Sequence, residues 1–226
     1  MTIKDNLNQI KTYKTDIKNA IINKGISMTG VPLSGYASKI TEISGDYIDV
    51  RNKLGDYYYS TRTSIPAYTF VGCYNLKSIS LPNCTTIGSS AFESCYNLSK
   101  GGLSFVSLPK CKSLYMYAFG YCSSIYYADL PVCTHIGSYA FTRVVKMSYV
   151  NIPKCNEIRN YAFMNCSAFK TISLSQVTSV TKLNSSNAFY NCTALTSIYV
   201  PMSLVDAFKS ATNWTYFSSK IVPWVN

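Results

Sequence analysis

Nine cysteines and a single histidine are the side chains of this 226-residue chain that could act as nucleophiles, bind a metal ion or form disulfide bonds. Their spacing argues against all three roles, because no Cys-x-x-Cys pair and no Cys/His pair at zinc-binding spacing occurs. Five cysteines lie three residues after a phenylalanine, and the other four share a second recurring position: Cys73, Cys95, Cys122, Cys166 and Cys192, then Cys84, Cys111, Cys133 and Cys155.

A cysteine that recurs in this way is typical of a small, buried, weakly polar side chain in a repeated core. Disulfides between stacked copies are the alternative. However, equivalent Cβ vectors in a stack run parallel at about 5 Å, which is wider than a disulfide prefers. We therefore expect two interior columns of reduced thiols, no metal site and no cofactor.

The histidine, His135, occupies a position that varies between copies, with Thr86, Ser113 and Glu157 as its counterparts. We expect a solvated turn residue there rather than a general base. No nucleotide-binding loop, serine-nucleophile elbow or zinc-protease helix motif is present. Residues 61–226 hold only four carboxylates, and no two share a phase in adjacent copies: Glu93, Asp129, Glu157 and Asp206. The chain is therefore not expected to be an enzyme.

A recurring Ala-Phe pair defines the elements that must position all these side chains. Successive phenylalanines are 22, 27, 22, 22 and 26 residues apart, with Thr69-Phe70 as an imperfect first copy: Phe70, Phe92, Phe119, Phe141, Phe163 and Phe189. A period of 22 indicates a solenoid, in which stacked repeats share one core. The extra residues near Ser99 to Gly102 and near Val180 to Asn187 predict two bulging loops.

Within each unit, an alternating stretch such as Ile79-x-Leu81 predicts a strand, and the proline after it ends that strand. The recurring string Ala-Phe-x-x-Cys-x-x-Leu-x-x-Ile-x-Leu-Pro resembles the BspA type of leucine-rich repeat over roughly residues 61–201, with departures at Val144, Ser175 and Val177. We expect an α+β fold: a leucine-rich-repeat solenoid of about six 22-residue coils, flanked by an N-terminal helical segment and a C-terminal cap.

Residues 1–45 do not follow the repeat and predict a helical docking or capping segment. Five apolar residues follow a 3.5-residue spacing, with Lys14 at the missing position: Ile3, Leu7, Ile10, Ile17 and Ile21. Two interpretations stay open, a coiled coil that would make a homo-oligomer such as a trimer, or a helical pair that covers the first coil or docks onto another protein. Residues 46–60 are expected to form a joint to the array.

Residues 202–226 predict a C-terminal cap, because an open solenoid end exposes both core and strand edges. Leu204 to Lys209 matches a short amphipathic helix. Five further residues are expected to cover the last coil: Trp214, Tyr216, Phe217, Ile221 and Val222.

The N-terminal strings Ile17 to Gly25 and Pro32 to Ile40 resemble a short segment that precedes variable domains in tail and other virion proteins of tailed phages from gut bacteria. Leu204 to Lys209, with Asn213 and Trp214, is similar to the end-piece that closes BspA-type arrays in such proteins. The resemblance implies attachment to a virion and contacts with other virion proteins through the N-terminal helices.

Basic residues outnumber acidic ones, with 21 Lys and Arg against 10 Asp and Glu in the whole chain. The cations fall at differing phases of the repeat, so we do not expect nucleic acid as a partner. Polyanionic glycans are an equally natural partner for such a surface, and solubility alone is the simplest explanation of the charge. No signal peptide and no apolar run of membrane-spanning length occurs, which predicts synthesis in the host cytoplasm without membrane insertion.

The outward positions of the expected strands carry tyrosine with serine and asparagine, a composition typical of adaptable recognition surfaces. We expect a binding patch for a host surface protein or glycan formed by Phe105, Tyr126, Tyr127, Asp129, Tyr149 and Asn151. The alternative is that 20 tyrosines merely decorate a solvated sheet. The sequence thus favours a non-enzymatic phage virion structural protein whose array serves adhesion or decoration. A cellular BspA-like adhesin or protein-interaction scaffold is the alternative.

Overall fold

The computed structural model describes residues 62–73, 76, 79–96 and 103–225. The chain divides into two units, Met1–Leu54 and Gly55–Asn226, and all the described residues belong to the second. Three features expected from the sequence lie outside the described residues: the N-terminal helices with their seam, the joint over residues 46–60, and the loop near Ser99 to Gly102.

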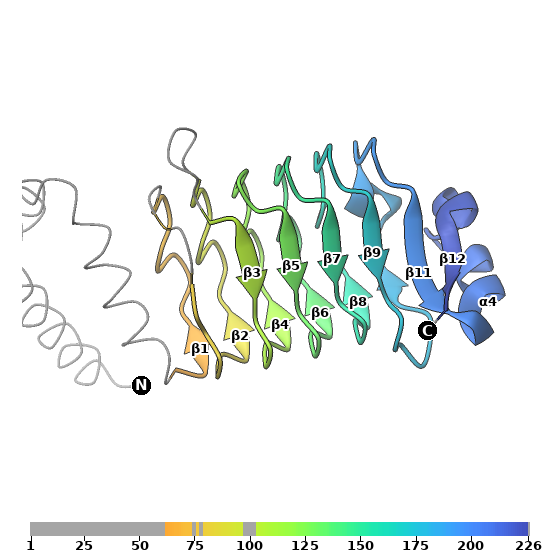
Figure 1. The fold of residues 1–226 in the computed structure, drawn as a ribbon, viewed down its shortest axis with the longest axis horizontal. Coiled ribbons are helices and arrows are strands. Elements are labelled where there is room, and N and C mark those ends of the chain that lie inside the picture. The colour runs from red at the N-terminus through yellow and green to blue at the C-terminus, as the bar shows by residue number, and fades with distance from the viewer. Residues whose placement is uncertain (1–61, 74–75, 77–78, 97–102, 226) are drawn as a thin grey trace, which may run out of the picture. The chain divides into compact units, whose positions relative to one another are not determined.

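The strands predicted from alternating residues stack in parallel and form one sheet, called here the long-strand sheet (Figure 1). Its strands, in chain order, are β3 (Phe105–Ser107), β5 (Tyr127–Asp129), β7 (Tyr149–Asn151), β9 (Thr171–Ser173), β11 (Ser197–Pro201) and β12 (Ile221–Trp224). The register pairs Tyr127 with both Phe105 and Tyr149, so equivalent residues of successive coils lie side by side. The first predicted copy, Ile79 to Leu81, is not a strand, although Leu81 is buried.

A second parallel sheet, called here the short-strand sheet, was not predicted. It consists of two-residue strands: β1 (Ser64–Ile65), β2 (Thr86–Ile87), β4 (Ser113–Leu114), β6 (His135–Ile136), β8 (Glu157–Ile158) and β10 (Lys182–Leu183). The expectation of a turn at His135 is therefore wrong, because this residue begins β6 with its side chain exposed. Each strand contributes one outward polar and one buried apolar residue, too short a stretch to show a period in the sequence.

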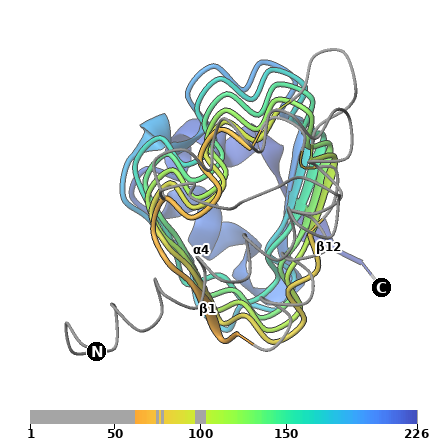
Figure 2. The same ribbon diagram turned by 90° about the vertical axis from the view of Figure 1, so that its left-hand side faces the viewer.

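Turns that contain the Ala-Phe pairs link the two sheets on the remaining side of each coil (Figure 2). Backbone hydrogen bonds join these turns from coil to coil. For example, the Phe119 amide donates to the Ala140 carbonyl at 2.8 Å. From Phe70 to Phe163, the residues two before and two after each repeat phenylalanine adopt left-handed φ values near 60°, among them Tyr117, Tyr139 and Tyr121. A bulky residue rarely adopts this conformation, which costs free energy.

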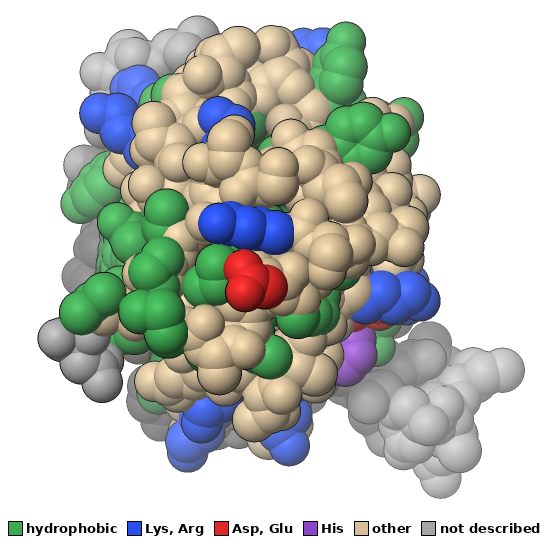
Figure 3. All heavy atoms as spheres, turned by 90° about the vertical axis from the view of Figure 1, so that its right-hand side faces the viewer, with side chains coloured by type: hydrophobic (Ala, Val, Ile, Leu, Met, Phe, Trp, Pro, Cys, Tyr) green, Lys and Arg blue, Asp and Glu red, His purple; other side chains and the backbone are tan. Residues whose placement is uncertain are grey.

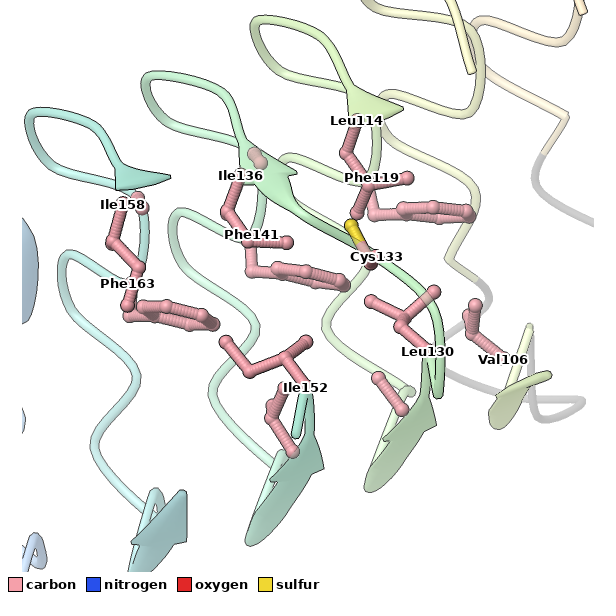
Figure 4. Close-up of a cluster of buried hydrophobic side chains, with 14 of the residues drawn as sticks. Val106, Leu114, Phe119, Leu130, Cys133, Ile136, Phe141, Ile152, Ile158 and Phe163 are labelled. Atoms are coloured by element: carbon pink, nitrogen blue, oxygen red, sulfur yellow. The ribbon is translucent and has the colours of Figure 1, made fainter. Parts of the chain in front are cut away.

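Stacked phenylalanines fill the centre of the array (Figure 4). From Phe70 to Phe189, successive rings of the repeat lie 4.9 to 5.6 Å apart and nearly parallel. The inward residues of both sheets pack around them, for example Leu130 and Ile136, each fully buried. Each stacked aromatic pair contributes about 1 kcal/mol beyond the burial of its area.

The cysteines form the two interior columns predicted from their spacing. All nine are free thiols, and only Cys73 and Cys192 are less than fully buried. Cys122 donates its Sγ hydrogen to the Phe92 carbonyl of the preceding coil at 2.9 Å. In the second column, Cys133 donates to the carbonyl of His135, two residues ahead, at 3.4 Å. The thiols therefore satisfy backbone carbonyls where the chain turns.

Residues 202–225 pack against the last coil at the end shown by α4 and β12 in Figure 1. They comprise three short helices and a strand: η3 (Met202–Leu204), α4 (Val205–Ser210), η4 (Thr215–Lys220) and β12. Phe208 and Trp214 are fully buried and Ile221 nearly so, whereas Tyr216 is 74% exposed, so its expected covering role is wrong. Tyr216 lies in a short helix that buries none of its own residues.

The expected loop over Val180 to Asn187 is not a loop throughout. It contains β10 and the start of η2 (Ser186–Phe189), whose first turn is capped by the Ser185 side chain. Within the described part of the chain, no helix has the length and hydropathy to cross a membrane.

Candidate interaction surface

Three neighbouring strands bring together five of the six residues predicted to bind a partner. Alternation turns Val106, Ala128 and Val150 into the core, and the residues on either side of them outward. Tyr126 lies one residue before β5 and is 54% exposed. We call this surface the aromatic face: Phe105, Tyr126, Tyr127, Asp129, Tyr149 and Asn151.

The rings of the aromatic face form a ladder across the strands. Phe105 and Tyr127 stack with centroids 5.3 Å apart and planes 2° from parallel, and Tyr127 stacks on Tyr149 at 5.4 Å and 15°. Because the rings lie flat against each other, their faces are largely used within the ladder. Ring edges and the two hydroxyl groups remain for a partner.

Asp129 lies beside this ladder, in the second outward column. Its Oδ1 accepts a hydrogen bond from the Asn151 side-chain amide at 2.7 Å. Burial, the Asp129 charge and Tyr149 together raise the pKa of Tyr127. Burial is the main cause of a raised pKa for Tyr149. The hydrogen bond with Ser173 opposes this rise, and the Asp129 charge adds to it. Both phenols therefore stay protonated at neutral pH and can donate hydrogen bonds.

The other end of the long-strand sheet carries a second aromatic pair that the sequence reasoning missed. Tyr199 meets Trp224 edge to face at 5.5 Å, and Trp224 is 39% exposed. Its strand, β12, contains Pro223, a residue that suits an edge strand because it lacks a backbone donor. The segment Ile221 to Trp224 could have been recognised by its β-branched and aromatic residues.

A second tyrosine ladder lies at the turns and was also missed. Tyr139 stacks between Tyr117 and Tyr161, with centroids 4.8 and 5.0 Å away. The nearby Arg143 guanidinium lies 5.8 Å from the centre of the Tyr121 ring. The recurrence of tyrosine two residues before the repeat phenylalanine was the available signal.

The outward positions of the short-strand sheet carry polar side chains, including the charged Glu157 and Lys182, rather than aromatic rings. Glu157 lies 3.3 Å from the Arg159 Nε and 3.6 Å from the Lys182 Nζ. Burial alone would raise the pKa of Glu157, but the Arg159 hydrogen bond and charge, helped by Asn184 and Lys182, lower it overall. This carboxylate is thus held ionised by cations and is a poor proton donor.

A groove of about 570 Å³ with a mixed polar and apolar lining lies where the last coil meets residues 211–214. Two of its lining side chains are already engaged, because Asn213 and Trp214 donate to the carbonyls of Leu183 and Thr181. On this end of the array, cationic side chains are scattered rather than gathered into a stripe (Figure 3). Among the described residues, no cluster of His, Cys, Asp or Glu could hold a metal ion, and no buried side-chain N or O atom lacks a hydrogen-bond partner.

Comparison with known proteins agrees with this architecture. The family described as the BspA type leucine rich repeat region matches residues 56–168 and 100–218, in six copies. A search of curated proteins gave no match.

Three solved structures are similar to this chain. A leucine-rich repeat protein from Bacteroides ovatus is 16% identical over 72% of this chain and 52% of its own, with a TM-score of 0.42. A leucine-rich repeat protein of T. pallidum is 20% identical over 64% of this chain and 74% of its own, with a TM-score of 0.40. A leucine rich cell surface protein from Faecalibacterium prausnitzii is 19% identical over 71% and 55%, with a TM-score of 0.37.

The chain thus spans about half the length of the first and third of these proteins. The family match covers most of the chain and most of the described residues. On that basis the chain belongs to the BspA type leucine-rich repeat family.

Proposed function

We propose that this protein is a non-enzymatic binding protein that uses the aromatic face to hold a macromolecule on a cell surface. The observation that carries the proposal is the ladder of Phe105, Tyr127 and Tyr149 on adjacent strands. Tyrosine gives a large contact area at low entropic cost, and stacking orders these rings before a partner arrives. Asp129 and Asn151 supply polar contacts alongside.

The test is binding of the labelled full chain to cells of a panel of gut bacteria, measured by flow cytometry. Changing Tyr127→Ser together with Tyr149→Ser should abolish binding, because it removes two rungs of the ladder. The matched control changes Tyr115→Ser and Tyr190→Ser, two tyrosines that are 54% and 58% exposed outside the aromatic face. Loss of binding in the control but not in the first pair would contradict the proposal.

We propose further that the N-terminal segment attaches the protein to a phage particle, leaving the array exposed for host adhesion or decoration. The resemblance of Ile17 to Gly25 and of Pro32 to Ile40 to virion protein segments supports this. In this proposal Ile3, Leu7, Ile10, Ile17 and Ile21 contact other virion proteins or further copies of the chain.

Deletion of residues 1–45 should release the protein from purified particles, as measured by mass spectrometry of the particles. Immunogold labelling of intact particles should place the array on their outside. A truncated protein that still co-purifies with particles would contradict attachment through this segment.

A cellular adhesin or protein-interaction scaffold is the second candidate function. The family match over residues 56–218 favours it, because this family assignment does not depend on attachment to a virion. The genomic neighbourhood separates the two, because capsid, portal or tail genes on either side support the virion proposal.

A further inference from the structure

We infer that the aromatic face binds a protein partner that places a cationic side chain, arginine above all, against Asp129. This rests on the proposed function of the aromatic face and specifies the chemistry of its partner. The charge of this surface and the orientation of its rings both favour such a partner.

Asp129 is the only charged residue among the outward strand positions of the long-strand sheet from β3 to β12. Among the described residues, the salt bridges formed are those of Glu157 with Arg159 and Lys182, so none of these cations neutralises Asp129. Its one hydrogen bond, from the neutral amide of Asn151, leaves other lone pairs of the carboxylate open. An uncompensated negative charge therefore lies on β5, the middle strand of the aromatic face, in a chain with net charge +11.

The surroundings of Asp129 suit a guanidinium group. The outward neighbours Tyr127 and Tyr149 keep their phenol protons, and Ser107 of β3, which pairs with Asp129, is neutral. A guanidinium could bind the carboxylate while its methylene groups lie along the ring edges. The partial shielding of Asp129, which is half-buried, makes such a pair stronger than one in open solvent.

Glycans fit this surface less well. Sugars usually dock on the open face of an aromatic ring, but the faces between Phe105, Tyr127 and Tyr149 are stacked against each other. A polyanionic glycan would in addition bring its negative groups against Asp129, which costs binding free energy.

The direct test uses two small probes on the full chain with ¹³C-labelled tyrosine rings, followed by NMR. The probes are the peptides acetyl-Gly-Arg-Gly-amide and acetyl-Gly-citrulline-Gly-amide, which differ in charge but hardly in shape. The Tyr127 and Tyr149 signals, assigned by Tyr127→Phe and Tyr149→Phe, should shift with the arginine peptide. They should respond about fivefold more weakly to the citrulline peptide, as expected when a surface charge pair is lost.

The Asp129→Asn variant should reduce the response to arginine to the level of citrulline, because it removes the charge and keeps an acceptor for Asn151. Asp206→Asn is the control, because Asp206 is an exposed residue of α4 and should change nothing. Equal responses to the two peptides would overturn the inference, because the surface would then not recognise charge. A stronger response of the same tyrosines to a heparin tetrasaccharide would also overturn it, in favour of a glycan partner.

Cell binding separates this inference from the proposed function. If Tyr127→Ser with Tyr149→Ser abolishes cell binding while Asp129→Asn leaves it unchanged, the aromatic face binds its partner without a cation and the inference fails alone. If neither variant alters cell binding, both fail. Loss of binding in both variants, with Asp206→Asn unaffected, supports both.

Discussion

The indole Nε1 of Trp214 donates a hydrogen bond to the backbone carbonyl of Thr181 at 2.6 Å, and both residues are buried. Thr181 directly precedes β10, the last strand of the short-strand sheet, and its own hydroxyl bonds to the Cys155 carbonyl at 2.7 Å. The Trp214 side chain therefore bonds a carbonyl of the last coil that no further coil is present to bond.

Trp214→Phe should lower the free energy of unfolding by about 1 to 3 kcal/mol, because it leaves the Thr181 carbonyl buried without its partner. Trp214→Ala should cost more, about 3 to 5 kcal/mol, since it also opens a cavity. Urea unfolding of both variants measures this. Trp224→Phe is the control, and an equal loss of stability there would argue against a specific role for the Trp214 bond.

Gly137→Ala should destabilise the array because a Cβ there would lie 2.6 Å from the backbone carbon of Tyr115 and 2.7 Å from the Leu114 oxygen. Backbone atoms cannot move aside as a side chain can, so we expect a loss of about 1 to 3 kcal/mol in urea unfolding. Gly120→Ala should cost less, because the nearest atom is a side-chain carbon of Tyr117 at 3.0 Å. A larger loss of stability in Gly120→Ala than in Gly137→Ala would contradict this packing.

The left-handed φ of Tyr139, 59°, should make Tyr139→Gly more stable than Tyr139→Ala. Both variants lose the stacking on Tyr117 and Tyr161, but only alanine keeps the Cβ that strains this conformation. We expect a difference of about 1 to 2 kcal/mol in thermal or urea unfolding. Equal stability of the two variants would show that this position relaxes out of the left-handed region.

Stability should fall at alkaline pH because of the buried thiols. Burial, more than any other cause, raises the pKa of Cys133 and of Cys155 from 9.0 to about 12. Above about pH 9 the unfolded chain loses protons that the folded chain keeps, so the free energy of unfolding decreases as pH rises. Below that pH these groups have no effect.

Urea unfolding at about pH 7 and about pH 10.5 should show this decrease. Cys133→Ala with Cys155→Ala should make the decrease shallower, whatever its effect on stability at neutral pH. A slope identical to that of the natural sequence would assign the decrease to other groups, such as the tyrosines.

The long-strand sheet could be predicted because each unit repeats an alternating stretch such as Ile198 to Val200, followed by proline in every copy except the one with Ser175. The short-strand sheet could not, since a strand like His135–Ile136 holds one apolar residue and has no period. The cysteine columns followed from spacing alone. Which C-terminal residues are buried could not be predicted from the sequence. Trp214 and Tyr216 are both aromatic, and no repeat distinguishes the buried one from the exposed one.

The positions of the outward side chains of the aromatic face were equally predictable, since alternation decides which residues leave the core. The stacking of Phe105 on Tyr127 and the pairing of Asp129 with Asn151 needed the register between coils. The binding role of these residues stays a prediction.

The strict register of the coils has a consequence for how such a gene can change. Copying a stretch of 22 codons, for instance those for residues 120–141, would insert one whole coil whose strands meet their neighbours at matching atoms. Residues 202–225 would keep their own contacts with the last coil while the aromatic ladder gained a rung. Unequal recombination between copies can therefore change the length of the array by whole coils without altering the C-terminal residues that cover its last coil.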